Sequence, residues 1–137
     1  MNITMKILPE REIDENGFSW SLNETTINDF CEINLMSEDY WTRMDYERQW
    51  KNGLARIKIH DTSCLVISTQ HPKKNKPFVN WWVLFKEGDQ IIINNRIIIE
   101  DSYTRLIGNK NFSPDNCYDF IEPRRKKSKI SEWIVEL

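Results

Sequence analysis

Three apolar segments in the middle of the chain predict consecutive β-strands. They are rich in branched and aromatic residues and cover residues 63–69, 79–86 and 90–99. The tripeptide at residues 87–89 places a glycine between the second and third segments, where a tight turn needs one. Because strands with short connections usually pair antiparallel, these segments predict an antiparallel sheet. Two uninterrupted isoleucine triplets, residues 91–93 and 97–99, indicate strands that are covered on both faces.

The asparagine pair between the two triplets has two interpretations. Asn94 and Asn95 interrupt an otherwise continuous apolar segment, and asparagine tolerates left-handed backbone. The pair fits a tight turn between two strands, and it fits a bulge within one strand equally well.

The strongest helix signal covers residues 38–58. Its apolar residues recur at helical spacing on one stripe, which consists of Tyr46, Trp50, Leu54 and Ile57 and is widened by Tyr40, Met44 and Ala55. Ser37 is a suitable N-cap. Arg43 follows Asp39 by four residues, so we expect these two side chains to pair. Gly53 costs a helix up to ~1 kcal/mol relative to alanine, which suggests a close neighbour at that position.

The two ends of the chain carry shorter patterns. On the N-terminal side they predict a strand over residues 3–8 that ends at Pro9, a loop over 10–17, an extended segment over 18–22 and a short helix over 27–33. On the C-terminal side they predict strands over 118–122 and 130–137, with a basic link at 124–127. Together the elements predict an α+β fold, in which one long amphipathic helix packs on a face of a mainly antiparallel β-sheet. At 137 residues the chain is expected to form a single domain, residues 1–137.

The composition is that of a folded, globular protein. Six tryptophans and six phenylalanines can fill a core, and charged residues make up 29% of the chain. No apolar run approaches the roughly 18 residues that span a bilayer, and the N-terminus lacks the apolar stretch of a signal peptide. We therefore expect a cytoplasmic protein with no membrane partner. Cys31, Cys64 and Cys117 are widely spaced and fit reduced thiols better than a disulfide framework.

Charge is distributed unevenly although the net charge is only −2. Residues 10–47 contain eleven acidic residues and only two basic ones, Arg11 and Arg43, which gives this segment a net charge of −9. An acidic surface attracts a basic partner and accelerates the encounter. The same acids also fit an ordinary solvated surface.

Catalytic and metal-binding patterns are missing from the sequence. His60 and Cys64 are four residues apart, but no second pair completes a tetrahedral metal site. Four glycines form no loop that could hold a phosphate. We therefore expect no metal, no cofactor, no small-molecule substrate and no catalytic residue. An enzyme of unrecognised type is a distant alternative, which would require a pocket lined by a strongly perturbed carboxylate, histidine or cysteine.

Basic residues near tryptophans suggest a nucleic-acid-binding or regulatory protein as the first alternative. The C-terminal cluster consists of Arg124, Arg125, Lys126, Lys127 and Lys129 near Trp133, and a second cluster consists of Lys73, Lys74 and Lys76 near Trp81 and Trp82. Aromatic rings beside cations can stack bases and hold phosphates. An overall pI near 5.7 weighs against a dedicated nucleic-acid binder.

Four motifs in order resemble one family. They are Trp41-x-Arg43-x-Asp45-Tyr46-x-x-Gln49-Trp50, the segment from Trp81 to Asp89 (WWVLFKEGD), Ile93-Asn94-Asn95, and Ile130-Ser131-Glu132-Trp133. Over about residues 40–137 the chain resembles the immunity proteins of bacterial contact-dependent growth inhibition systems. The resemblance implies a non-catalytic protein that binds and blocks the C-terminal toxin domain delivered by a neighbouring cell. Such toxins are commonly nucleases, and each immunity protein typically recognises only its cognate toxin.

The acidic segment suggests which residues contact such a toxin. A nuclease must bind phosphate and therefore has a basic working face, which an acidic surface complements. The residues expected to contact the partner lie in the acidic loop and on the polar face of the long helix; they are Glu12, Asp14, Glu15, Glu38, Asp45 and Glu47.

Overall fold

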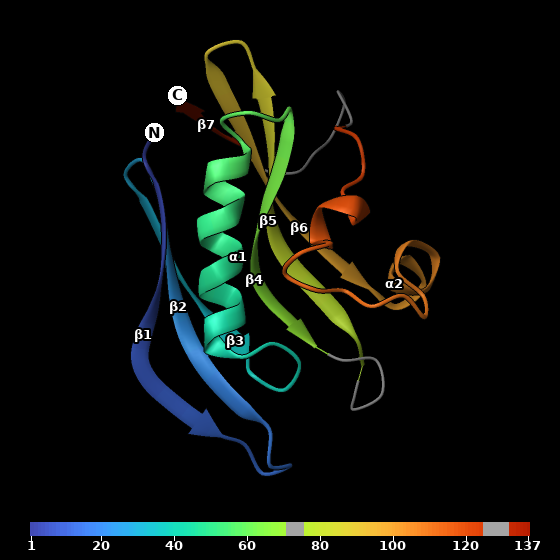
Figure 1. Ribbon diagram of the computed structural model, residues 1–137. Helices are drawn as coiled ribbons and strands as arrows, with labels where there is room; N and C mark the ends of the chain where they lie inside the picture. The colour runs from blue at the N-terminus through green and yellow to red at the C-terminus, as the bar shows by residue number, and fades with distance from the viewer. Residues whose placement is uncertain (71–75, 125–131) are drawn as a thin grey trace.

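The computed structural model describes residues 1–70, 76–124 and 132–137, which form seven strands and three helical segments (Figure 1). In chain order these are β1 (Ile3–Ile13), β2 (Ser19–Ile27), β3 (Phe30–Ser37), α1 (Arg43–Arg56), β4 (Thr62–Gln70), β5 (Phe78–Glu87), β6 (Gln90–Ile99), α2 (Glu100–Leu106), the 3-10 helix η1 (Cys117–Phe120) and β7 (Glu132–Glu136). The α+β class and the antiparallel pairing are confirmed. The predicted single sheet is wrong, because the strands form two sheets, β1-β2-β3 and β4-β5-β6-β7.

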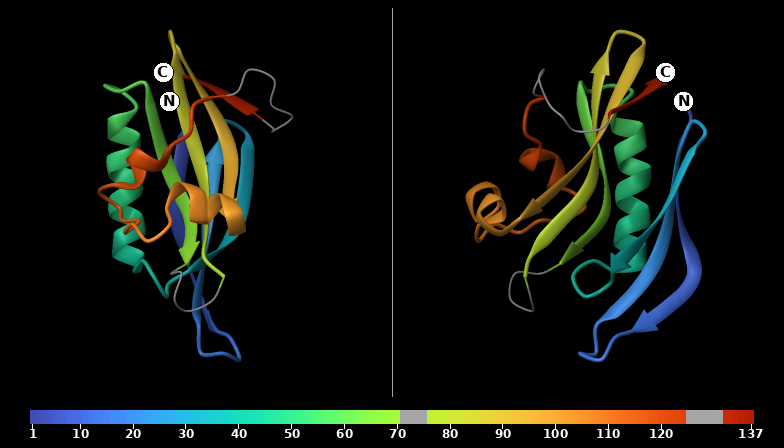
Figure 2. Two further views of the ribbon diagram at one scale, coloured as in Figure 1. Left: turned by 90° about the vertical axis from the view of Figure 1, so that its right-hand side faces the viewer. Right: turned by 180° about the vertical axis from the view of Figure 1, so that it is seen from behind.

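The two sheets pack face to face, and the core lies on both faces of the second sheet. Trp82 of β5 points toward the first sheet, where its indole nitrogen donates to Thr25 Oγ1 at 2.9 Å. The preceding residue, Trp81, points to the opposite face and packs edge-on against Phe112. Figure 2 shows the first sheet and the segment containing α2 and η1 on opposite sides of the second sheet. Burial on both faces explains the uninterrupted apolar runs of β4, β5 and β6.

Helix α1 lies along the outer edge of β4, the last strand at one end of the second sheet. Gln49 donates from Nε2 to the Cys64 carbonyl at 2.7 Å and accepts at Oε1 from the Val66 amide at 2.8 Å. Trp50 Nε1 donates to the Val66 carbonyl at 2.7 Å. Side chains of α1 thus satisfy backbone groups of β4 as a further strand would.

Tyr46 extends this contact to the first sheet. Its hydroxyl donates to the Ser37 carbonyl of β3 at 2.6 Å and accepts from the Thr69 amide of β4 at 3.0 Å. The ring is completely buried, and burial raises the pKa of the phenol far above its ordinary value. Tyr46 therefore joins α1, β3 and β4 at one point.

The long helix begins later than the sequence predicted. Its N-cap is Thr42, whose Oγ1 accepts from the Asp45 amide at 3.2 Å while Asp45 accepts from the Thr42 amide at 2.9 Å. This capping box outcompetes Ser37, which ends β3 instead. Met44, expected on the apolar stripe, is 81% exposed. Arg43 does not pair with Asp39, which precedes the helix.

Two predictions for the N-terminal region are wrong. Pro9 does not end β1, since β1 is an edge strand and its pairing with β2 shifts register between Ile7 and Arg11, where a missing amide is tolerated. Strand β1 therefore includes the first part of the predicted loop over residues 10–17. Residues 27–33 form a hairpin instead of a helix, because Asn28 adopts the left-handed conformation (φ 52°) that a two-residue turn needs.

The C-terminal half also departs from the predictions. Strand β6 runs without a turn or bulge. The side chains of Asn94 and Asn95 fit an extended strand, because their Nδ2 atoms donate to the Glu132 carboxylate at 3.0 Å and to Asn80 Oδ1 at 2.8 Å. Residues 118–122 include the end of η1 and do not form a strand. Ser113 and Asn116 bond each other's backbone amides and begin this turn. Helix α2 was not predicted, and residues 130 and 131 lie outside the described residues.

The close approach expected at Gly53 is confirmed. A Cβ atom on Gly53 would lie 2.3 Å from the Cys64 carbonyl oxygen, which belongs to the backbone of β4. Glycine is therefore needed so that α1 can lie close enough for Gln49 to reach β4.

We predict that Gly53→Ala destabilises the protein although alanine favours helix by ~1 kcal/mol. Overpacking against a backbone carbonyl, which cannot move aside as a flexible side chain can, falls at the upper end of the usual cost, about 2–3 kcal/mol, so the free energy of unfolding should fall by about 1–2 kcal/mol net. Urea unfolding measures it. Asn52→Ala is the matched control, because Asn52 is exposed on the same helix and its replacement should be neutral or stabilising. Equal stability of the two variants would contradict the close approach.

Candidate functional site

The six acidic residues predicted to contact a partner fall into two groups. Glu12 on β1, Glu15 in the β1–β2 turn and Glu47 on α1 are exposed, and within the described part of the chain they have no hydrogen bond or ion pair. These three carboxylates are available to a partner. Asp14, Glu38 and Asp45 are each engaged by other groups of the protein.

Glu38 is the most strongly engaged of the six. Its side chain is 5% exposed and accepts two hydrogen bonds from Arg11, at 2.9 and 3.0 Å, while the Arg43 guanidinium lies 3.8 Å away. Burial opposes ionisation, but the hydrogen bonds from Arg11 and the two guanidinium charges outweigh it and lower the pKa of Glu38. Arg43 also donates to the Leu8 carbonyl at 2.7 Å. Glu38 therefore anchors β1 to the start of α1.

Asp14 and Asp45 shape the backbone around them. Asp14 accepts from the indole nitrogen of Trp20 at 3.0 Å and from the amides of Asn16 and Phe18 at 2.9 and 3.0 Å. The hydrogen bond from Trp20 is the main cause of a lowered pKa of Asp14. Asp45 belongs to the capping box of α1. The Thr42-x-x-Asp45 spacing is a recognisable signal that identifies Asp45 as a helix cap.

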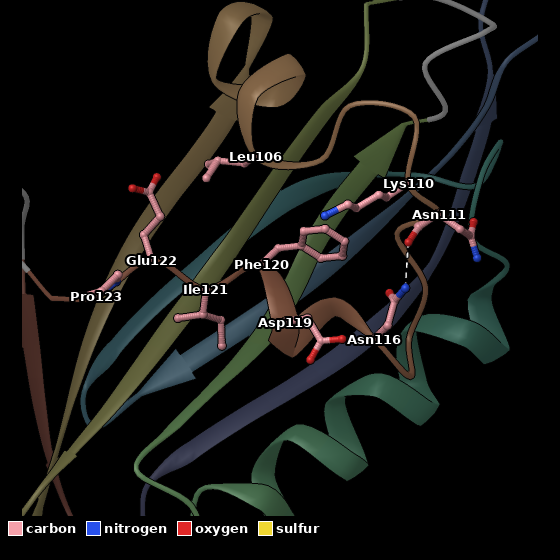
Figure 3. A pocket seen from close by; sticks show the side chains of 9 residues that line it. All are labelled: Leu106, Lys110, Asn111, Asn116, Asp119, Phe120, Ile121, Glu122 and Pro123. Atoms are coloured by element: carbon pink, nitrogen blue, oxygen red, sulfur yellow. Dashed lines mark hydrogen bonds between the residues drawn. The ribbon is translucent and has the colours of Figure 1, made fainter.

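Two adjoining cavities lie beside α2 and η1. The first, of about 540 Å³, is drawn in Figure 3 and is lined by Leu106, Lys110, Asn111, Asn116, Asp119, Phe120, Ile121, Glu122 and Pro123. The second, of about 490 Å³, shares Leu106, Phe120, Glu122 and Pro123 with it and extends along β6. Asn116 Nδ2 donates to the Asn111 carbonyl at 2.7 Å, which fixes part of the rim.

None of the described groups whose pKa is shifted lines either of these cavities. Among the described carboxylates the pKa is lowered at Asp14, Glu38 and Glu132, and none of these lines either cavity. Cys64 and Cys117 are buried with their sulfurs 3.6 Å apart, and burial raises the pKa of Cys64 well above its usual range. The described residues contain no group of three His, Cys, Asp or Glu side chains arranged to hold a metal ion.

The arrangement of the tryptophans does not suit base stacking. Trp81 and Trp82 are both 1% exposed and belong to the core. Arg124 forms ion pairs with Glu87 and Glu132, so its charge is already compensated. The other cations of the C-terminal cluster, together with Lys73 and Lys74, lie outside the described residues. In the described part of the chain, no helix is long and apolar enough to cross a bilayer.

An exposed apolar stripe on the first sheet was missed because residues 27–33 were interpreted as a helix. Cys31, Ile33 and Leu35 alternate with Glu32 and Asn34, and this period-two pattern is the signal of a strand with one apolar face. The three side chains are exposed on the face of the sheet that points away from the core, Ile33 by 56% and Leu35 by 59%.

Comparison with known proteins assigns the chain to a class. A chain in a solved CdiA-CT/CdiI toxin and immunity complex from Enterobacter cloacae has the same fold, with a TM-score of 0.77 and 27% identity over 98% of this chain and 90% of that chain. The curated immunity protein CdiI of Enterobacter cloacae subsp. cloacae is 32% identical over 117 residues, which cover 81% of this chain and 75% of the relative. These matches place the chain among the immunity proteins.

The family is also shown directly. The model of the CdiI N-terminal domain matches residues 36–137. The chain therefore belongs to the CdiI family, and the resemblance to the immunity proteins of contact-dependent growth inhibition systems is confirmed. The match begins at Met36, so β1, β2 and most of β3 lie outside it.

We predict that Glu38→Gln lowers stability in a pH-dependent manner. Because the pKa of Glu38 is lowered on folding, its contribution is fully present above the unfolded carboxyl pKa of about 4.3 and is lost as the pH falls through the lower folded value. The difference in free energy of unfolding between wild type and Glu38→Gln should therefore be constant above about pH 5 and shrink below about pH 4.

Urea unfolding at several pH values measures this difference. Glu12→Gln is the control, since it removes an exposed carboxylate that has no described contact. A Glu38→Gln difference that is independent of pH would show that shape, and not charge, accounts for the contribution of Glu38.

Proposed function

We propose that this chain neutralises the CdiA-CT toxin domain encoded with it by direct, non-catalytic binding in the cytoplasm. The observation that carries the proposal is the shared fold with a chain of a toxin and immunity complex, over nearly the whole length of both chains. The sequence relationship to a curated immunity protein supports it independently. The chain then acts by occupying a surface of the toxin, and its own side chains need no chemical reactivity.

The charge of the exposed surface is consistent with a nuclease toxin as the partner. Glu12, Glu15 and Glu47 are exposed carboxylates without described partners, and a nuclease has a basic face that binds phosphates. Attraction between such faces speeds the encounter and disfavours partners of the wrong charge. Fast capture matters because a free nuclease turns over many substrate molecules before it is bound.

The primary experiment is a calorimetric titration of this chain into the CdiA-CT domain encoded with it. We expect a stoichiometric complex of nanomolar or tighter affinity and full inhibition of the toxin at a one-to-one ratio. RNA or DNA cleavage by the free domain would identify it as a nuclease. If a folded and active toxin gives no heat and is not inhibited, the proposal is wrong.

We predict that the double variant Glu12→Lys/Glu15→Lys binds the toxin at least about tenfold more weakly than wild type, and that its association depends less on salt. Asp14 is left unchanged, because its carboxylate holds the β1–β2 turn together. Surface plasmon resonance at low and moderate salt separates association from dissociation. The single variant Glu47→Lys tests the acids of α1 separately.

Asp61→Lys/Glu136→Lys is the matched control, since it makes the same change in net charge at two exposed acids outside the β1–β2 hairpin. An equal effect of the two double variants would mean that only the total charge matters and that Glu12 and Glu15 make no local contact.

A further inference from the structure

The first sheet has one buried face and one exposed face. In β2, Ser21, Asn23, Thr25 and Ile27 are buried, and the alternate residues Trp20, Leu22, Glu24 and Thr26 point the other way. Because directly paired residues of antiparallel strands share a face, the register places Leu22 beside Leu35 and Thr26 beside Cys31 on the outer face. Figure 2 shows α1 and the second sheet on the inner side of this sheet.

The outer face carries an apolar stripe with a rigid aromatic residue at one end. The stripe consists of Trp20, Leu22, Leu35, Ile33 and Cys31, of which Ile33 and Leu35 are 56% and 59% exposed. The Trp20 indole is held by its hydrogen bond to Asp14 at 3.0 Å. Interface centres typically combine an aromatic anchor with aliphatic side chains. Because the hydrogen bond to Asp14 already holds the Trp20 side chain, binding a partner would cost little further side-chain entropy there.

Acidic residues surround this stripe. Glu12 is paired with Trp20 across β1 and β2 and therefore lies on the same face, and Glu15 lies in the adjoining turn. Asp29 lies in the turn at the other end of the sheet and is exposed. Glu24 is compensated by Lys6 at 3.5 Å. An apolar centre with an anionic rim complements a protein surface that has an apolar centre and a cationic rim.

We infer that the outer face of the β1-β2-β3 sheet docks the toxin, and that the matching toxin surface is basic around an apolar centre. The inference rests on the proposed function and names the surface that performs it. Charge complementarity selects this occupant over a second copy of the chain, whose own acidic rim would face like charge.

The extent of the family match is consistent with a surface that determines specificity. All five residues of the stripe precede Met36, where the match to the family model begins, although the solved relative shares the fold over 98% of this chain. A sheet that is common in fold but lies largely outside the family model can carry the side chains that distinguish one toxin from another.

Cys31 allows the surface to be tested on the unmodified protein. Its thiol is exposed on the stripe, whereas Cys64 and Cys117 are buried, so a maleimide should label Cys31 selectively in the free chain. We predict that saturating CdiA-CT domain slows labelling of Cys31 at least about tenfold, measured by mass spectrometry of this chain. Unchanged labelling in a complex shown to be stoichiometric would overturn the inference and leave the proposed function standing.

A pair of double variants gives an independent test. Ile33→Ala/Leu35→Ala should weaken toxin binding by about 100-fold, at about tenfold per truncated residue. Ile97→Ala/Ile99→Ala is the matched control, because these residues are 58% and 47% exposed on β6 of the other sheet, and it should bind like wild type. Urea midpoints show whether each variant is folded.

Each remaining outcome has a defined meaning. Wild-type affinity in both double variants overturns the docking surface alone, and failure of the wild-type chain to bind the toxin overturns the proposed function as well. Sedimentation of the free chain tests a second copy as the occupant. A wild-type dimer that Ile33→Ala/Leu35→Ala converts to a monomer would show that the stripe is a self-association surface, contrary to the inference.

Discussion

The structure depends on the way in which α1 closes the edge of β4. An outermost strand exposes a row of unpaired backbone amides and carbonyls. Other chains can pair with this row unless another part of the protein covers it. Here Gln49 supplies one donor and one acceptor in the positions that a neighbouring strand would occupy, and Trp50 and Tyr46 each add one further hydrogen bond to β4. Gly53 is required because any side chain would hold the helix away from β4. The named residues of the Trp41–Trp50 motif are therefore architectural, and a partner is bound through side chains outside that set.

Sequence reasoning predicted the second sheet well because its signals are local. Strands β4, β5 and β6 have dense apolar runs and a glycine turn, and α1 has a strong stripe, so each element is determined by its own residues. Predictions failed where a single side chain changes the backbone. The left-handed Asn28 converts an expected helix into a hairpin, and the capping box at Thr42 moves the N-cap of α1 from Ser37 to Thr42, which is more than one turn.

The candidate site was harder to predict than the fold for a physical reason. Sequence shows that a residue is acidic, but it does not show which groups that acid contacts after folding. Glu38 and Glu12 are alike in sequence, yet Glu38 is almost fully buried between two guanidinium groups whereas Glu12 is exposed. The alternation in residues 31–35 was visible in the sequence. Its meaning depended on recognising the hairpin that precedes it.

The short sequence separation between α1 and β4 has a consequence for the order of folding. The hydrogen bonds from Gln49 and Trp50 to β4 close loops of only 15 to 17 residues, whereas the bonds that join the two sheets span 31 to 106 residues. Closing a short loop costs less chain entropy, so helix and strand can form a nucleus on which the rest assembles. The first sheet leaves the ribosome before that nucleus exists. It must therefore wait, with its apolar residues uncovered, until α1 and β4 provide a surface against which it can pack.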